Sequence, residues 1–213
     1  LKSDGSDKDL TATDLHSKVT VIDLNSQAAV LDADDLSKTI TGTTYTVKDT
    51  AEKIANLASS KFKGKTVQVT GRGKISHIKT ITDHAGSVTY KVKDETTHLV
   101  GVNKALIQGI DVEISSATVS AANYNAILVE ATKKAGGKVV GTVSDDISRI
   151  VAENKYSFTG NLDVIAKVES DNQDISALSL DTEIKKIDLN GKKGVIFSIE
   201  NVRTGGVNKT IQD

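Results

Sequence analysis

One short phrase occurs three times in this chain. It reads TVKDTAEKIANL from Thr46, KVKDETTHLVGV from Lys91 and TVSDDISRIVAE from Thr142. In each copy a valine stands two residues before a recurring aspartate, and an isoleucine or leucine stands five residues after it. Positions at helical spacing share one face of a helix, so each copy predicts a strand that runs into a helix. A chain that repeats such a corner at intervals of about 50 residues is built as an array.

The recurring aspartates are predicted to be helix caps. They are Asp49, Asp94 and Asp145, and a carboxylate at this position can accept hydrogen bonds from the unpaired amides of the first helical turn. Upstream, AVLDADDL from Ala29 matches ATVSAANY from Ala117, which makes Asp32 and Ser120 equivalent caps of an earlier helix. A helix cap is a structural role, so these carboxylates are not interpreted as catalytic or metal-binding groups.

The three copies are expected to differ in their first helix. After Ser120, the residues Tyr124, Ile127, Leu128 and Ala131 have helical spacing and predict a clear helix. The middle copy has ISHIKTITDHAGS in this place, which is interpreted as lacking that helix. The segment GRGK from Gly71 lacks the further glycine and hydroxyl residue of a phosphate-binding loop, so it is interpreted as a hairpin turn.

Alternating apolar and polar residues predict strands with one buried face. Tyr45 and Val47 alternate with Thr46 and Lys48, whereas strands covered on both faces read as continuous apolar runs. Strands joined by helices pair in parallel. The predicted fold class is therefore α/β, a repetitive, solenoid-like strand–helix array of largely parallel short strands with helices on one face. A mixed α+β fold with antiparallel sheets is the alternative, because antiparallel strands also alternate.

The repeat boundaries divide the chain into three regions. The expected regions are an acidic N-terminal linker or cap at 1–18, strand–helix repeats at 19–165 and a degenerate repeat or cap at 166–213. Within the middle region the repeats run over about 19–66, 67–109 and 110–165. Terminal units of repeat arrays are often atypical because they cap the stack.

Composition narrows the classes of function. Average usage predicts about 11 prolines in a chain of this length, but there are none, and cysteine is also absent. A formal net charge of −1 gives no bulk field for nucleic acid, and no apolar run is long enough for a transmembrane helix. The four histidines have no metal-ligand spacing, and no catalytic constellation is recognised, so the chain is predicted not to be an enzyme.

Two acidic clusters are candidate calcium sites, because calcium takes six to eight oxygen ligands. The first lies in SDGSDKD and the second, which also contains Glu169, lies in ESDNQD. Their candidate ligands are Asp4, Asp7, Asp9, Asp171 and Asp174. Neither cluster has the spacing of an EF-hand, and solvated loops are the competing interpretation. The prediction is no cofactor, with Ca²⁺ as the one candidate ion.

The repeated phrase resembles the degenerate strand–helix repeats of large secreted bacterial surface proteins. The resemblance rests on the phrase T-V-x-D-T-A-x-x-I-A and on the preceding A-x-V-S-A-x-x-Y-N-A-I segment, and it covers roughly residues 19 to 165. Such proteins include S-layer proteins and giant adhesins exported by type I secretion. The resemblance implies an extracellular, non-enzymatic role in a lattice or in attachment. The glycine-rich calcium repeat G-G-x-G-x-D is missing here, so a calcium requirement does not carry over.

Two functions remain open at this point. The first is a structural segment of a bacterial cell-surface, S-layer-like protein that acts in self-assembly or surface coating, by self-association or by stacking on neighbouring repeats of a longer chain. The alternative is an adhesin module that binds a surface glycan or host protein through an exposed sheet face. We expect the chain to be part of a longer protein whose export signal lies outside this sequence.

Overall fold

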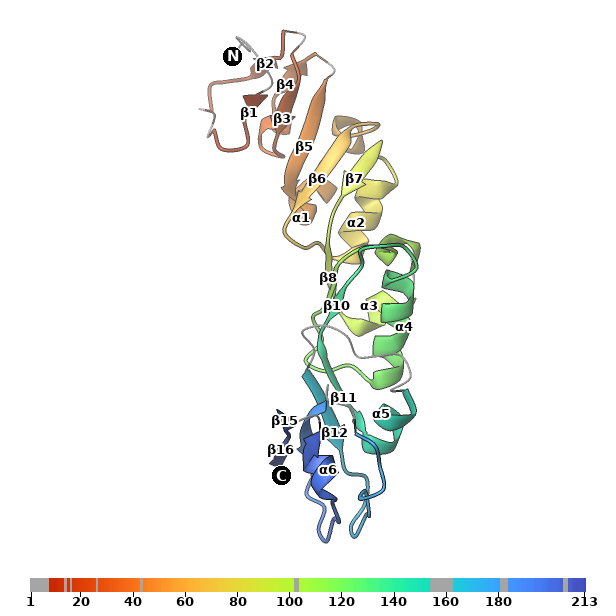
Figure 1. Cartoon of the computed structure of the whole chain (residues 1–213). Coiled ribbons are helices and arrows are strands. Elements are labelled where there is room, and N and C mark those ends of the chain that lie inside the picture. The colour runs from red at the N-terminus through yellow and green to blue at the C-terminus, as the bar shows by residue number, and fades with distance from the viewer. Residues whose placement is uncertain are drawn as a thin grey trace. The chain divides into compact units, whose positions relative to one another are not determined.

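The fold is mixed α/β, with short parallel strands and short helices (Figure 1). The chain divides into two compact units, Leu1–Lys93 and Asp94–Asp213. The computed structural model describes residues 8–13, 15, 17–25, 27–42, 44–101, 104–153, 163–180, 184–204 and 207–213. The parallel pairing agrees with the predicted α/β class, and β14 (Arg203–Thr204) with β15 (Val207–Asn208) is the antiparallel pair of the described chain.

The first unit is built on a five-stranded sheet with the order β1-β3-β5-β6-β7. Its strands are β1 (Lys8–Asp9), β3 (Ala29–Leu31), β5 (Tyr45–Thr50), β6 (Thr66–Thr70) and β7 (Ser87–Thr89). A second, two-stranded sheet pairs β2 (Val21–Asp23) with β4 (Thr39–Thr41). The helical segments are η1 (Asp35–Ser37), α1 (Ala51–Ala55), η2 (Ser59–Lys61) and α2 (Ile75–Thr82).

The strands of the five-stranded sheet are added in the order in which they occur in the chain. Thr46 pairs with Thr66, and Thr66 pairs with Ser87, all in parallel. Because parallel neighbours need a crossover between them, a connecting segment returns the chain to the start of the sheet after each strand.

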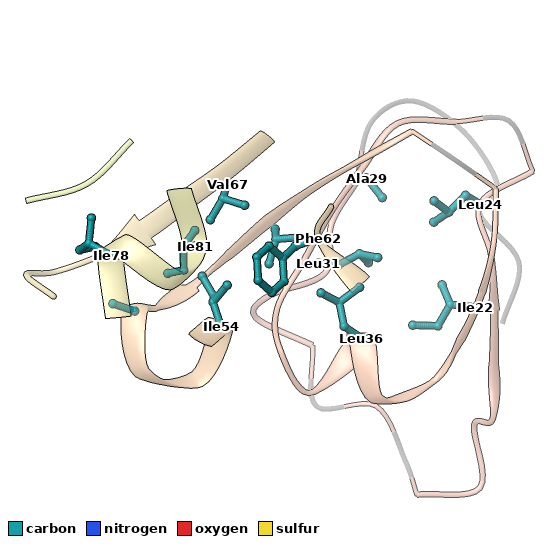
Figure 2. Close-up of a cluster of buried hydrophobic side chains, with 12 residues drawn as sticks. Ile22, Leu24, Ala29, Leu31, Leu36, Ile54, Phe62, Val67, Ile78 and Ile81 are labelled. Carbon is teal, nitrogen blue, oxygen red and sulfur yellow. The ribbon is translucent and has the colours of Figure 1, made fainter. Parts of the chain in front are cut away.

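The buried residues of the first unit lie on one face of this sheet. Val47 and Val67 are fully buried and belong to one cluster with Ile54 of α1 and Ile78 of α2 (Figure 2). The cluster continues through Phe62 to the loops around the two-stranded sheet. The valine before the recurring aspartate and the isoleucine five residues after it therefore meet in the core, as the helical spacing requires.

The second unit contains a three-stranded sheet, β10-β9-β8, and a four-stranded parallel sheet, β11-β12-β13-β16. Its strands are β8 (Val92–Asp94, at the unit boundary), β9 (Val112–Ile114), β10 (Val139–Val140), β11 (Thr142–Asp146), β12 (Asp163–Lys167), β13 (Ile184–Asp188) and β16 (Thr210–Gln212). Its helical segments are α3 (Thr96–Gly101), η3 (Lys104–Ile107), α4 (Ala121–Ala131), α5 (Ile147–Glu153) and α6 (Ile199–Val202).

The longest helix, α4, follows the predicted pattern. Tyr124, Ile127, Leu128 and Ala131 are all buried, so their helical spacing does form one apolar face. In the other two copies of the phrase, Leu99 of α3 and Ile150 of α5 are fully buried.

Two expectations about the middle copy are wrong. ISHIKTIT forms helix α2, which buries Ile75, Ile78 and Ile81, so the middle copy has a first helix. GRGK is not a hairpin turn, because β6 and β7 are parallel and the segment leads from β6 directly into α2. Gly73 of this segment also pairs in parallel with Val92. The three buried isoleucines do have helical spacing, but five of the eight residues of this helix are isoleucine or threonine, and such β-branched residues favour strands over helices.

Candidate functional site

Two of the three aspartates that recur in the repeated phrase, Asp49 and Asp145, bind a neighbouring segment of the array. One carboxylate oxygen of Asp49 accepts a hydrogen bond from the backbone amide of Ala33 at 3.2 Å, and Asp145 accepts one from the amide of Ala121 at 3.1 Å. Ala121 is the first residue of α4, and Ala33 is its equivalent in the predicted alignment. Each aspartate thus stabilises the start of the segment that follows the previous strand, where backbone amides lack partners.

Each recurring aspartate also accepts a local hydrogen bond. Asp49, Asp94 and Asp145 each accept the amide of the following residue, at 2.7, 2.9 and 2.9 Å. The buried Asp94 carboxylate also lies 2.8 Å from Nδ1 of His98. A carboxylate with two such partners holds a fixed orientation, which fits a structural role.

The predicted caps need a correction at the recurring aspartates. The cap of α1 is Thr50, whose hydroxyl accepts the amide of Lys53 at 3.4 Å, and Asp49 precedes it by one residue. Asp94 and Asp145 likewise stand two residues before the first residues of α3 and α5. The strand continues to the aspartate or beyond it, because its backbone still pairs with the neighbouring strand there.

Of the other two predicted caps, Ser120 is confirmed, whereas the cap position of η1 is Asp34 and not Asp32. Ser120 is the cap of α4, and its hydroxyl accepts the amide of Asn123 at 3.3 Å. Asp32 accepts the amide of Asp35 at 2.8 Å, and the Asp35 carboxylate accepts the amide of Asp32 at 3.4 Å. This reciprocal pair resembles a capping box in its bonds, but it closes the turn that precedes η1.

A second repeated corner, which the sequence analysis missed, ends three strands. At Asp9, Asp23 and Asp188 the carboxylate accepts the amide two residues on, at 3.0, 3.0 and 2.9 Å. The leucine after each aspartate donates its amide to a backbone carbonyl of the neighbouring strand. The accepting carbonyls belong to Val30, Thr41 and Gln212, respectively. The identical tetrapeptide Ile-Asp-Leu-Asn at 22–25 and 187–190 is the signal that could have revealed this corner.

In two of these three corners, the residue after the leucine has an uncommon backbone conformation. Asn25 and Asn190 have φ of 47° and 54°, in the left-handed region. Asparagine tolerates this region better than most residues, because its side chain can bond to nearby backbone.

An acidic pocket lies beside the turn that contains Asp32 and Asp35. It has a volume of about 750 Å³, and its lining includes Asp32, Asp34, Asp35, Thr11 and Lys38. Burial, followed by the charge of Asp32, raises the pKa of the Asp35 carboxyl to about 6. Because Asp35 is only 3% exposed, its raised pKa reflects the burial of the carboxyl group within this turn.

The predicted calcium ligands are not brought together in the described chain. Thr11 and then Lys48 lower the pKa of Asp9 to about 2, and Lys48 binds it at 3.0 Å. Asp171 accepts the amide of Lys193, and Asp174 accepts the amide of Ser176. Asp4 and Asp7 lie outside the described residues. Among the residues that the structure describes, no group of three or more histidine or acidic side chains is placed to hold a metal ion.

The face of the five-stranded sheet opposite the core carries rows of polar side chains. Thr66 and Ser87 are paired neighbours on this face, with 3.2 Å between their hydroxyl oxygens. In the next row, Lys48 of β5 pairs with Gln68 of β6, and Gln68 pairs with Thr89 of β7. The side chains of β6 and β7 in these rows are exposed, so the face is open to a ligand.

Comparisons with known proteins do not assign the chain to a class. No protein-family model matches the sequence, and neither curated proteins nor solved structures give a match. Among the described helices, none combines the length and hydropathy needed to cross a bilayer. A function for this chain must therefore be inferred from the geometry of each unit.

Proposed function

We propose that this chain is a structural segment of an extracellular, S-layer-like surface protein of bacteria, in which solenoid-like strand–helix units act by self-association. The observation that carries the proposal is the order of the strands. Each strand of the five-stranded sheet pairs in parallel with the next one, as in Thr46 with Thr66 and Thr66 with Ser87. The spacing of about 20 residues is that of a solenoid repeat.

The repeated hydrogen bonds support this array. The Asp-Leu corner recurs in both units, at Asp23 and at Asp188, and the aspartate bond to the previous turn recurs at Asp49 and Asp145. Repeats of this kind bury their apolar faces by stacking on neighbours, so the outermost strands keep unpaired backbone groups. A second copy or a further repeat can pair there.

Sedimentation velocity over a wide range of protein concentration tests the proposal, in calcium chloride and in EDTA. The wild-type chain is expected to form larger species as its concentration rises. Ile211→Lys places a charge on β16, the outermost strand of its sheet, and should weaken assembly. Val129→Lys is the matched control, because Val129 of α4 is similarly exposed, at 46% against 43% for Ile211. A wild-type chain that stays monomeric throughout and does not coat bacterial cells refutes the proposal.

The polar face of the first unit favours the second function, an adhesin module that binds a glycan through its sheet. The supporting observation is the open pair of rows that contains Thr66, Ser87, Gln68 and Thr89. Hydroxyl and amide groups are the side chains that exchange hydrogen bonds with sugar hydroxyls. A glycan array probed with the labelled chain tests this function, and the absence of any bound glycan would exclude it.

A further inference from the structure

The last part of the second unit repeats a strand arrangement of the first unit. Asp174 pairs in parallel with Ile196, as Asp9 of β1 pairs with Val30 of β3. In both places the aspartate accepts the amide two residues further on, at 2.9 and 3.0 Å respectively. The residue after each aspartate donates its amide to the carbonyl of the paired residue, at 3.0 and 2.9 Å. The segment 195–197 is therefore the equivalent of β3 in the second unit.

The turn after each of these segments is also closed in the same way. Ser198 accepts the amide of Asn201 at 3.2 Å, and the side chain of Asn201 accepts the amide of Ser198 at 2.8 Å. Asp32 and Asp35 exchange the same two bonds in the first unit. Asn201 and Asp35 are both buried polar side chains. Both turns therefore begin at the same distance from the paired strand residue.

The strand that follows this turn is equivalent as well. Asp188 in the second Ile-Asp-Leu-Asn tetrapeptide pairs with Gln212 of β16, as Asp23 in the first pairs with Thr41 of β4. In the first unit, β5 begins after three further residues and pairs in parallel with β3. The described part of the second unit has no strand in the place of β5 beside the segment 195–197.

The outer edge of the segment 195–197 is consequently uncovered. Both backbone groups of Ile196 bond to the segment 173–175. Backbone groups alternate between the two sides of a parallel strand, so those of Val195 and Phe197 point the other way. Within the described part of the chain they bond to no other segment. A strand edge of this kind can accept an added strand through main-chain hydrogen bonds.

The side chains at this edge are more exposed than their equivalents in the first unit. Leu31 pairs with β5 and is fully buried, whereas Phe197 in its place is half-buried. Ala33, whose amide donates to Asp49 of β5, is 6% exposed. Ile199 in its place is 76% exposed, and its amide has no acceptor among the described residues. The uncovered surface thus corresponds, position by position, to the surface that β5 covers in the first unit.

We propose that the segment 195–197 pairs in parallel with a further strand–helix repeat of the same array, of the type formed by residues 45–55. The proposal rests on the proposed S-layer-like function and identifies what one of its uncovered edges binds. The ladder from the segment 173–175 to the segment 195–197 continues with this repeat, as the ladder from β1 to β3 continues with β5. Repeats of this kind bury their apolar faces on their neighbours.

The contacts of the added repeat follow from those of β5. Its strand exchanges main-chain hydrogen bonds with Val195 and Phe197, and an apolar residue in the position of Val47 packs against Phe197. Its aspartate, in the position of Asp49, accepts the amide of Ile199. A second copy of the chain is a less suitable occupant, because β5 of that copy is already paired with β3 and β6.

An extended chain tests this proposal. A copy of residues 43–57 is appended directly after Asp213, which follows β16 as Gly42 follows β4. The amides of Val195 and Phe197 are expected to exchange with deuterium on the order of tenfold more slowly in the extended chain than in the wild type, because they gain acceptors. The midpoint of urea unfolding should rise at the same time.

The matched control is the same extension with Val47→Lys in the appended copy. It keeps the length and direction of the added strand but places a charge where an apolar side chain must pack, so exchange should remain at the wild-type rate. A synthetic peptide of residues 43–57, added to the wild-type chain, provides a second measurement that does not depend on the folding of an extended chain. The Val47→Lys peptide is its control.

The possible results separate this proposal from the function on which it rests. Slower exchange at Val195 and Phe197 with the unaltered repeat, but not with the Val47→Lys repeat, supports the docking edge. Equal slowing by both repeats would show unspecific shielding and would overturn it. Unchanged exchange with both extension and peptide would also overturn it, while concentration-dependent assembly of the wild type would leave the proposed function standing. A monomeric wild type whose edge is protected by the added repeat would remove self-association alone. Protection of these amides in the concentrated wild type, without any added repeat, would assign the edge to a second copy and overturn the proposal.

Discussion

Removal of the Asp145 carboxylate tests whether the recurring aspartates hold the array together. The side chain of Asp145 is 9% exposed and accepts the amides of Ala121 and Asp146. A hydrogen bond to a charged group contributes about 1.5–3 kcal/mol. The Ala121 amide loses this partner in Asp145→Ala, whereas water can reach the Asp146 amide more easily. We expect a loss of about 2–3 kcal/mol in the free energy of unfolding.

The neighbouring residue provides the matched control. Asp146 is 40% exposed, and its carboxylate lies 3.5 Å from Nε of the exposed Arg149. Exposed ion pairs contribute about 0–1 kcal/mol, so Asp146→Ala should cost correspondingly little. Urea unfolding followed by far-ultraviolet circular dichroism measures both losses, and amide hydrogen exchange at Ala121 reports the local bond. Equal losses in the two variants, or unchanged exchange at Ala121 in Asp145→Ala, would refute the reasoning.

Three further predictions concern packing and protonation. Ile150→Ala should lower the free energy of unfolding in urea by about 2–5 kcal/mol, because Ile150 is fully buried. The exposed Lys93 should tolerate substitution by alanine, and similar losses at both positions would contradict this description of the core. Gly73→Ala should cost about 1–3 kcal/mol, because its new Cβ would lie 2.5 Å from the Cβ of Ala51; an unchanged melting temperature would show that this contact relaxes freely. The pKa of Asp35 in the folded state, about 6, lies above its ordinary value of 3.8, so ionisation of Asp35 lowers the stability of the fold as pH rises between these values. Asp35→Asn should therefore raise the melting temperature at pH 7.5 but have little effect at pH 4. An equal shift at both pH values would contradict the assignment.

The strand-to-helix corners were predictable because their signals are local. Val47, Val92 and Val143 stand on strands and are fully buried, as their spacing from Ile54 and Ile150 requires. Local hydrogen bonding also made Ser120 recognisable as a cap. Such features depend on residues within one or two turns of chain, and their periodicity is visible in any single copy.

The failures had a different physical origin. The bond from Asp49 to Ala33 joins residues 16 positions apart, so no local pattern distinguishes it from an ordinary helix cap. Helix α2 forms because Ile75, Ile78 and Ile81 have a core to pack against, although its many β-branched residues favour a strand in isolation. The Asp-Leu corner was visible as a repeated tetrapeptide, but its meaning depends on the neighbouring strand that accepts the leucine amide.

The sequence by itself determined the recurring corner, the buried valines and isoleucines and the half-polar strands of this protein. These properties follow from side-chain periodicity, which each segment carries alone. Only the tertiary structure decided that the strands of the first sheet are added in chain order and that Asp145 binds the start of α4. It also decided that the segment 195–197 pairs with the segment 173–175, as β3 pairs with β1. The physical reason is that pairing register and the convergence of separate loops depend on contacts between segments distant in the chain.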